Sequence, residues 1–252
     1  MAQRFPTIWM DSVDSTNSEI VRRLPELDNL SVIAAVDQTA GRGQRGNSWK
    51  VEPGANLTFS VLLRFGGDGL APVHAREQFC ISMATALAQV EYFASRGIAA
   101  SVKWPNDIYC RNRKISGVLI ENTLSGSGIS RSIIGIGMNV NQTEFPPQLL
   151  NPVSMAVLTG KRYDVRGELD AFLPILGRHL EMIQTEEGRK KVAEKYLEHM
   201  FAFGESRTFT DCSDGNPFTG KITGVTPEGR LRIETAEGAL REFAFKEVSF
   251  VL

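Results

Sequence analysis

Cysteine and histidine are scarce in this 252-residue sequence, which contains only three of each. The cysteines, Cys80, Cys110 and Cys212, lie far apart, and none belongs to a CxxC pair. This spacing argues against a disulfide framework and against a zinc site built from neighbouring ligands. Scattered, reduced thiols are typical of cytosolic proteins, so we expect a cytoplasmic location.

Long hydrophobic runs are also missing. The longest apolar stretch, residues 79–94, contains Gln89 and Glu91 and is too short to span a bilayer. The N-terminal residues include Arg4, but no apolar segment follows it, which argues against a signal peptide. We therefore expect no membrane partner.

Neither sign of charge is in excess. The sequence has 28 Lys and Arg against 29 Asp and Glu, a formal net charge of -1, and 42% of its residues are hydrophobic. Overall basicity therefore cannot drive the chain onto nucleic acid, and the apolar content argues against disorder. The few residues before Asp14 also leave no room for a helix-turn-helix module, so we expect no nucleic-acid partner.

The hydrophobic pattern predicts both strands and helices. Alternation over residues 56–65 places Leu57, Phe59, Val61, Leu63 and Phe65 on one side of a strand. Residues 76–93 change to a helical period with one apolar face. Further strands are predicted over 30–36, 101–110, 114–123 and 131–140, and two helices between 166 and 200. Paired strands mixed with helices favour an α+β fold with a mixed β-sheet and flanking helices.

The sequence changes character near residue 204. Beyond it, short strand-like segments alternate with turn residues, which predicts a small β-barrel. We therefore expect a larger domain over residues 1–203 and a small β-domain over residues 204–252.

A glycine-rich segment follows the strand at 30–36 and reads Gly41-Arg42-Gly43-Gln44-Arg45-Gly46. Glycines let backbone N–H groups approach a ligand, and arginine forks match carboxylate or phosphate. A flexible surface turn with solvated arginines explains the segment equally well. It is not a Walker A loop, because GxxxxGK[ST] does not occur in the sequence.

Two lysine motifs stand at predicted strand ends. Lys103-Trp104-Pro105-Asn106-Asp107 interrupts a strand and exposes a cation together with oxygen ligands of the kind that Mg²⁺ accepts. Lys114-Ile115-Ser116-Gly117 begins the next strand, and its glycine leaves space beside the lysine. Taken singly, a strand-ending turn and a solvated hairpin lysine are simpler interpretations of these motifs.

Two further segments complete the set. Gly135-Ile136-Gly137-Met138-Asn139 places glycines inside a strand, where they mark a close approach or a β-bulge, and Asn139 could contact a purine edge. Ser15-Thr16-Asn17 precedes a short helix, and its N-terminus could hold a polar ligand. The capping pattern from Thr16 to Glu19 explains that segment as well. If these strand ends share one sheet edge, the cations gather around a site for two anions.

Together and in this order, the five motifs resemble those of the biotin protein ligases, and the resemblance covers nearly the whole chain. It implies a catalytic domain like that of class II aminoacyl-tRNA synthetases and a C-terminal SH3-like barrel. It also implies an ATP-dependent reaction in two steps, in which biotin becomes biotinyl-5′-AMP and then passes to a lysine of a biotin carboxyl carrier protein.

The resemblance assigns a role to each motif. Lys114, Arg42 and Asp107 are the implied catalytic residues, and Asp107 is also the implied Mg²⁺ ligand. Residues implied for biotin are Ser15, Thr16, Asn17, Gln38, Gly41, Arg42, Gly43, Gln44, Lys114 and Gly117. Residues implied for ATP and the adenylate are Arg42, Arg45, Trp49, Lys103, Asn106, Lys114, Gly135, Gly137 and Asn139.

The sequence departs from the family in its glycine loop. Many members have arginine where this chain has Gln44, so we expect Arg42 and Arg45 to retain the adenylate. The short N-terminus implies a monofunctional ligase, and family analogy implies a homodimer. Two alternatives are a lipoate ligase or octanoyltransferase, which would need a nucleophilic cysteine in the second case, and a biotin sensor without catalysis.

Overall fold

The computed structural model describes residues 4–149 and 151–251 and contains two β-sheets. The larger sheet has seven strands in the order β1-β2-β3-β7-β6-β5-β4. β1 runs parallel to β2, and all other neighbours are antiparallel. The strands are β1 (Thr7–Val13), β2 (Val32–Gln38), β3 (Leu57–Arg64), β4 (Ser101–Lys103), β5 (Asp107–Cys110), β6 (Arg113–Ser125) and β7 (Gly128–Met138).

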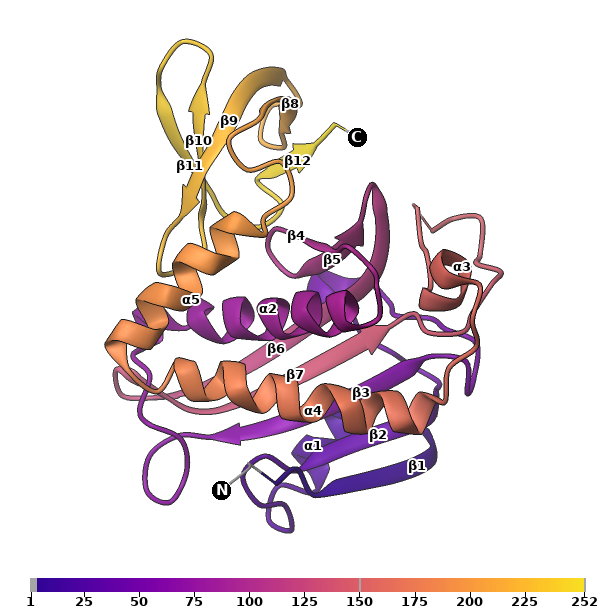
Figure 1. The fold of residues 1–252 in the computed structure, drawn as a ribbon. Coiled ribbons are helices and arrows are strands. Elements are labelled where there is room, and N and C mark those ends of the chain that lie inside the picture. Colours follow the sequence, from indigo (N-terminus) through magenta and orange to yellow (C-terminus); the bar gives the residue numbers. More distant parts are fainter. Residues whose placement is uncertain (1–3, 150, 252) are drawn as a thin grey trace.

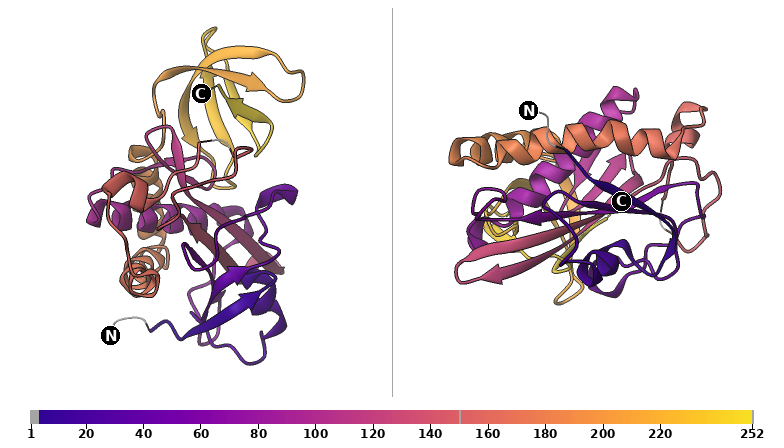
Figure 2. Two further views of the ribbon diagram at one scale, coloured as in Figure 1. Left: turned by 90° about the vertical axis from the view of Figure 1, so that its right-hand side faces the viewer. Right: turned by 90° about the horizontal axis from the view of Figure 1, so that it is seen from below.

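Helices cover the two faces of this sheet unequally (Figures 1 and 2). The long helices α2 and α4 lie across one face, and α5 leads from them to the C-terminal sheet. The short α1 lies on the opposite face. The helices are α1 (Thr16–Arg22), α2 (Phe79–Ser95), α3 (Met155–Thr159), α4 (Val165–Met182) and α5 (Glu186–Glu198). Among the described helices, none is both long and apolar enough to cross a membrane.

The alternation predicted for β3 is confirmed. Leu57, Phe59, Val61 and Leu63 are buried in the main core beneath the helices. The intervening Ser60 therefore faces the other side of the sheet, because successive strand residues point in opposite directions. A smaller apolar cluster on that side, made by Ile20, Leu27, Ile33, Leu62 and Ile133, packs α1 against the sheet. This packing fixes the start of α1 beside the middle of β3 and β7.

Two predictions about the helices are wrong. The capping box from Thr16 to Glu19 does not form, because the N-cap is Ser15, which makes no side-chain cap bond. Glu19 pairs with Arg22 instead. The helix predicted over 76–93 is buried on most sides, since α4 and α5 also pack on α2, so its pattern is not that of a helix with one apolar face.

The C-terminal segment forms a five-stranded antiparallel sheet in the order β11-β10-β9-β8-β12. Its strands are β8 (Ser206–Asp211), β9 (Pro217–Val225), β10 (Leu231–Thr235), β11 (Leu240–Phe243) and β12 (Val248–Phe250). Its apolar side chains, such as Phe209 and Ile233, join the same core cluster as α2 and α5. We propose residue 204 as the domain boundary, where Gly204 has φ +71° and donates to the carbonyl of Ile222.

Candidate active site

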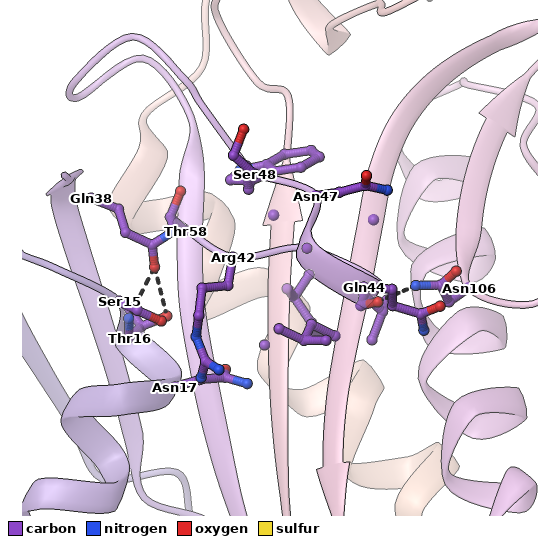
Figure 3. A pocket seen from close by; sticks show the side chains of 18 of the residues that line it. Ser15, Thr16, Asn17, Gln38, Arg42, Gln44, Asn47, Ser48, Thr58 and Asn106 are labelled. Carbon is purple, nitrogen blue, oxygen red and sulfur yellow. Dashed lines mark hydrogen bonds between the residues drawn. The ribbon is translucent and has the colours of Figure 1, made fainter. Parts of the chain in front are cut away.

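A cleft lies on the α1 side of the larger sheet, where β3, β7 and β6 form its floor (Figure 3). The loop of residues 41–49 passes over it, and the start of α1 closes one end. The C-terminal sheet contributes Phe245 from the loop before β12. Predicted site residues that line the cleft are Ser15, Thr16, Asn17, Gln38, Arg42, Gly43, Gln44, Trp49, Asn106, Asp107, Lys114, Gly117, Gly135 and Gly137.

Two glycines of β7 make the floor of the cleft. A Cβ atom at Gly135 would stand closer than 3.0 Å to Oδ1 of Asn17, and one at Gly137 would overlap the indole of Trp49. The close approach predicted for these glycines is therefore made by two side chains of the cleft itself. Any larger residue at position 135 or 137 would displace one of them, because real Cβ atoms do not come this close to other heavy atoms.

The glycine-rich loop is closed by its own backbone. Trp49 donates its N–H to the carbonyl of Gly41 at 2.9 Å, and Gly43 donates to Asn47 at 2.6 Å. A short 3-10 turn, Gln44–Gly46, forms the tip. Gly41 lacks space for a side chain because a Cβ atom would overlap the Trp49 carbonyl and the Gln38 amide. The loop therefore holds Arg42 over the cleft on a fixed base.

A β-bulge places Lys114 on the cleft side of β6. Tyr109 pairs with Lys114 while Ile108 pairs with Ser116, so Ile115 is an extra residue, and it is buried in the main core. Residues three apart in a regular strand face opposite sides, but the bulge brings Lys114 and Gly117 to the same side. Nζ of Lys114 lies 2.6 Å from Oδ1 of Asp107, and Gly117 leaves the space in which the lysine lies.

A chain of hydrogen bonds connects Thr16, at the start of α1, to Arg42 of the glycine-rich loop. The hydroxyls of Thr16 and Ser60 are 2.7 Å apart, and Ser60 donates to Oδ1 of Asn17 at 2.5 Å. Nδ2 of Asn17 donates to Glu121 at 2.7 Å. The same carboxylate accepts hydrogen bonds from both terminal nitrogens of Arg42, at 3.0 and 2.9 Å. In Figure 3 the Arg42 side chain extends from the loop to Asn17.

Lys103 lies outside the cleft lining. Its backbone is opposite Asp107 in the register of β4 and β5. Its Nζ, however, lies 3.3 Å from the Tyr109 hydroxyl and 5.3 Å from the ring centre of Phe250 in β12. Burial between these rings lowers the pKa of Lys103, and burial raises the pKa of Tyr109 to about 12. The predicted gathering of cations at one edge is therefore only partial in this structure.

Asn139 lies outside the cleft lining as well. Asn139 is buried below the cleft, and its Nδ2 donates to the carbonyl of Val153 at 3.1 Å. Its backbone N–H donates to Ile115, so it anchors the bulge that presents Lys114. The side chain of Arg45 lies outside the described residues.

Replacing Asn139 with alanine is expected to lower the free energy of unfolding by about 1–3 kcal/mol, because the buried Val153 carbonyl loses its donor. Urea denaturation measures this loss. Asn141→Ala, which removes a partly buried amide bonded to Tyr163, is the matched comparison. Unchanged stability in Asn139→Ala would show that the amide has no structural role.

The acidic residues do not form a metal cage. Within residues 4–149 and 151–251, no three His, Cys, Asp or Glu side chains gather closely enough to hold a metal ion. Asp107, the predicted Mg²⁺ ligand, already pairs with Lys114. The protein side chains alone therefore do not fit a resident metal.

Several residues of the site were not predicted from the sequence, among them three polar residues of β3 and β6. Glu121 and Ser60 belong to the hydrogen-bonded chain, and Thr58 lines the cleft. Strand alternation could have located them, because Thr58 and Ser60 face away from the apolar side of β3, and Glu121 shares a face with Gly117. The hydroxyl of Thr58 and Nε1 of Trp49 are buried without a hydrogen-bond partner in the described part of the chain.

Known proteins with this sequence pattern and fold agree with one another. The sequence model of the biotin/lipoate A/B protein ligase family matches residues 9–139, and the sequence model of the biotin protein ligase C-terminal domain matches residues 208–251. A biotin--[acetyl-CoA-carboxylase] ligase of Paracoccus denitrificans is 31% identical over 235 residues, which cover 89% of this chain and 96% of the relative. Another, from Mycobacterium tuberculosis, is 26% identical over 87% of this chain and 80% of its own length.

The solved structures lead to the same result. The biotin protein ligase from Aquifex aeolicus in complex with biotin and ATP has a TM-score of 0.76 to this chain and 29% identity, with 98% of both chains covered. The predicted α+β class with a mixed sheet and a small C-terminal β-domain is confirmed. The chain belongs to the biotin/lipoate A/B protein ligase family, and within it to the biotin protein ligases.

Proposed function

We propose that this protein catalyses ATP-dependent biotinylation in the cleft between β7, α1 and the loop of residues 41–49. In the first step, a carboxylate oxygen of biotin attacks the α-phosphorus of ATP, and the bond to the β-phosphate breaks to release pyrophosphate. In the second step, a lysine amine attacks the acyl carbon of biotinyl-5′-AMP, and AMP leaves. The observation that carries this proposal is the position of Arg42 and Lys114 over one glycine-floored cleft.

The two cations address the main electrostatic difficulty of the first step. A carboxylate and a phosphate about 4 Å apart repel each other by roughly 4 kcal/mol at an effective dielectric constant near 20. Lys114 between them would offset this repulsion and stabilise the charge that develops during the transfer. Arg42 would bind the carboxylate and the adenylate from the loop through its planar fork.

The remaining cleft residues divide between the two substrates. Ser15, Thr16, Asn17 and Gln38 would hold the ureido head of biotin, because they present hydrogen-bonding groups at the start of α1. Trp49 would cover the adenine from the loop, and Asn106 would contact the phosphates. Lys103 would have to leave its position between Tyr109 and Phe250 to reach them.

Mg²⁺ would enter the cleft with ATP, and the acceptor lysine would enter with the carrier protein. Since the protein donors do not fit a resident metal, Mg²⁺ would arrive bound to the phosphates of ATP, as it commonly does. The acceptor lysine, with an ordinary pKa of about 10.4, must lose a proton before it attacks. Asp107 is our proposed base for that proton, because it is a carboxylate that lines the cleft beside Lys114.

The proposed protein partner is a biotin carboxyl carrier protein, which presents the acceptor lysine. We also propose a homodimer formed through an edge of the larger sheet, where β1 is the edge strand. Sedimentation of the protein with and without biotin tests this assembly. The reaction itself requires no nucleic acid.

Pyrophosphate release tests the function directly. The purified protein should release pyrophosphate with biotin and ATP, and not with biotin alone. It should then label a biotin carrier domain and leave a lipoyl domain unlabelled. Labelling of the lipoyl domain with lipoate would favour a lipoate ligase instead. Binding of biotin without any release of pyrophosphate would favour a biotin sensor.

Retention of the adenylate should depend on Arg42. Arg42→Ala is expected to speed the release of biotinyl-5′-AMP by about tenfold, because a hydrogen-bonded charge contact is lost. Gln44→Arg should slow release, since it adds a cation to the tip of the loop beside the cleft. Rapid dilution of the preformed complex, followed by capture of the free adenylate, measures both rates. Equal rates in all three proteins would refute the role of this loop.

A further inference from the structure

Glu121 receives hydrogen bonds from residues that serve opposite ends of the proposed substrate. Its Oε2 accepts from Nδ2 of Asn17 at 2.7 Å and from Nη2 of Arg42 at 2.9 Å. Asn17 belongs to the proposed biotin head pocket, and Arg42 to the proposed anion site. One carboxylate on β6 therefore joins the two halves of the cleft.

The carboxylate fixes the direction of every hydrogen bond behind it. An ionised carboxylate can only accept, so Asn17 must turn its NH₂ group toward Glu121 and its Oδ1 toward Ser60. Ser60 has one proton, which it donates to Oδ1 of Asn17 at 2.5 Å. The 2.7 Å bond between Thr16 and Ser60 must then be donated by Thr16, whose single hydroxyl proton therefore goes to Ser60 and not to Oε1 of Gln38, 3.3 Å away. The three side chains thus have a single consistent proton order.

This order is built in a dry part of the cleft. Thr16 and Asn17 are each 3% exposed, and Ser60 is fully buried. Only the outer end, the ion pair of Arg42 and Glu121, is open to solvent, with side-chain exposures of 45% and 38%. Because an ion pair this exposed contributes little to stability, its position is better explained by what it orients than by what it stabilises.

We propose that Glu121 is a positioning residue for biotinylation, which orients Asn17 and Arg42 at the same time. With the proton order fixed, Asn17 retains one N–H and Thr16 retains free lone pairs on Oγ1. A donor and an acceptor on neighbouring residues of α1 match a urea-like group, which offers one carbonyl oxygen and an N–H. The proposal rests on the biotin ligase function proposed above.

Two substitutions separate the two tasks of Glu121. Glu121→Leu removes every acceptor oxygen, so the buried amide of Asn17 loses its partner and Arg42 loses its carboxylate. Glu121→Gln keeps one acceptor oxygen for Asn17 but removes the charge that holds Arg42. The matched control is Glu242→Gln, which breaks an ion pair with Arg232 of the same 2.9 Å length and similar exposure, 43% and 40%, in the C-terminal sheet.

Biotin binding without ATP, measured by calorimetry, reports the head pocket alone. Glu121→Leu is expected to weaken biotin binding by about tenfold, since a buried N–H is left unsatisfied. Glu121→Gln should weaken it less, although both variants should form adenylate more slowly than the wild type. Glu242→Gln should match the wild type in both assays. Biotin affinity in Glu121→Leu equal to that of the wild type would overturn the proposal, as would an equal loss in the Leu and Gln variants.

A double-mutant cycle separates a directed chain from a general loss of structure. Hydrogen bonds through Ser60 and Asn17 link the side chain of Thr16 to Glu121, so Thr16→Val and Glu121→Leu should have non-additive effects on biotin affinity if the chain acts as a unit. Additive effects would refute it. If the wild type itself neither binds biotin nor releases pyrophosphate, the proposed function fails, which is a different result from the failure of Glu121.

Discussion

Replacing Lys114 with alanine is expected to slow pyrophosphate release by about 10²–10³-fold, the range typical for the loss of one group that stabilises developing charge. Lys114 lines the cleft, and its Nζ lies 2.6 Å from Asp107 and 5.8 Å from the ring centre of Trp49. Without it, the carboxylate of biotin and the α-phosphate would meet with their repulsion largely uncompensated. Single-turnover formation of biotinyl-5′-AMP measures this effect.

The control for Lys114 is the preceding residue of the same strand. Arg113→Ala also removes one positive charge from β6, but Arg113 is exposed and donates to the carbonyl of Pro152 outside the cleft. It should keep nearly full activity. When preformed biotinyl-5′-AMP is supplied, the deficit of Lys114→Ala should shrink, since the two anions are already joined. An equal loss in Arg113→Ala would show that net charge, and not the position of Lys114, controls the rate.

Replacing Gly135 with alanine should weaken biotin binding by about a hundredfold while leaving the fold intact. The new methyl group would occupy the space of the Asn17 side-chain oxygen, so Asn17 must move. That movement would break its bonds to both Ser60 and Glu121, and each bond is worth about 1–3 kcal/mol when a buried group is left unpaired. Calorimetric titration with biotin measures the loss.

The same strand provides the comparison for Gly135. At Gly128 the nearest atom to an added methyl group is the Val73 carbonyl oxygen at 3.5 Å, an ordinary contact. Gly128→Ala makes the same chemical change in β7, and should bind biotin as tightly as the wild type. Circular dichroism should show folded protein for both variants. Tight biotin binding by Gly135→Ala would mean that Asn17 does not contact the ligand.

The sequence was most informative where a single strand determines which way a side chain points. Alternation between Leu57 and Leu63 predicted the buried side of β3, and the glycines of β7 predicted a close approach. These two inferences depend only on neighbours in sequence. Arg42 and Lys114 were assigned by the resemblance of the five motifs taken together, because each motif alone is explained as well by a surface turn or a solvated lysine.

Features that depend on distant parts of the chain were not predictable in this way. Asn139 faces the buried carbonyl of Val153, and Lys103 lies against Phe250 of the last strand, contacts that no local pattern encodes. The bulge at Ile115 is another such feature, since only the register between β5 and β6 reveals it. Strand alternation places Glu121 on the face of Gly117, but its role was missed because only the structure reveals Asn17 and Arg42 as its partners.

The bare floor of β7 also determines how this cleft can be redesigned. Gly135 and Gly137 present no side chain that could be trimmed, so substitutions there can only make the cleft shallower. Above these two glycines, space for a bulkier analogue of the natural substrate can come only from the roof, where the indole of Trp49 lies over Gly137. A library that aims at enlarged substrates should vary residues 41–49 and leave the strand untouched.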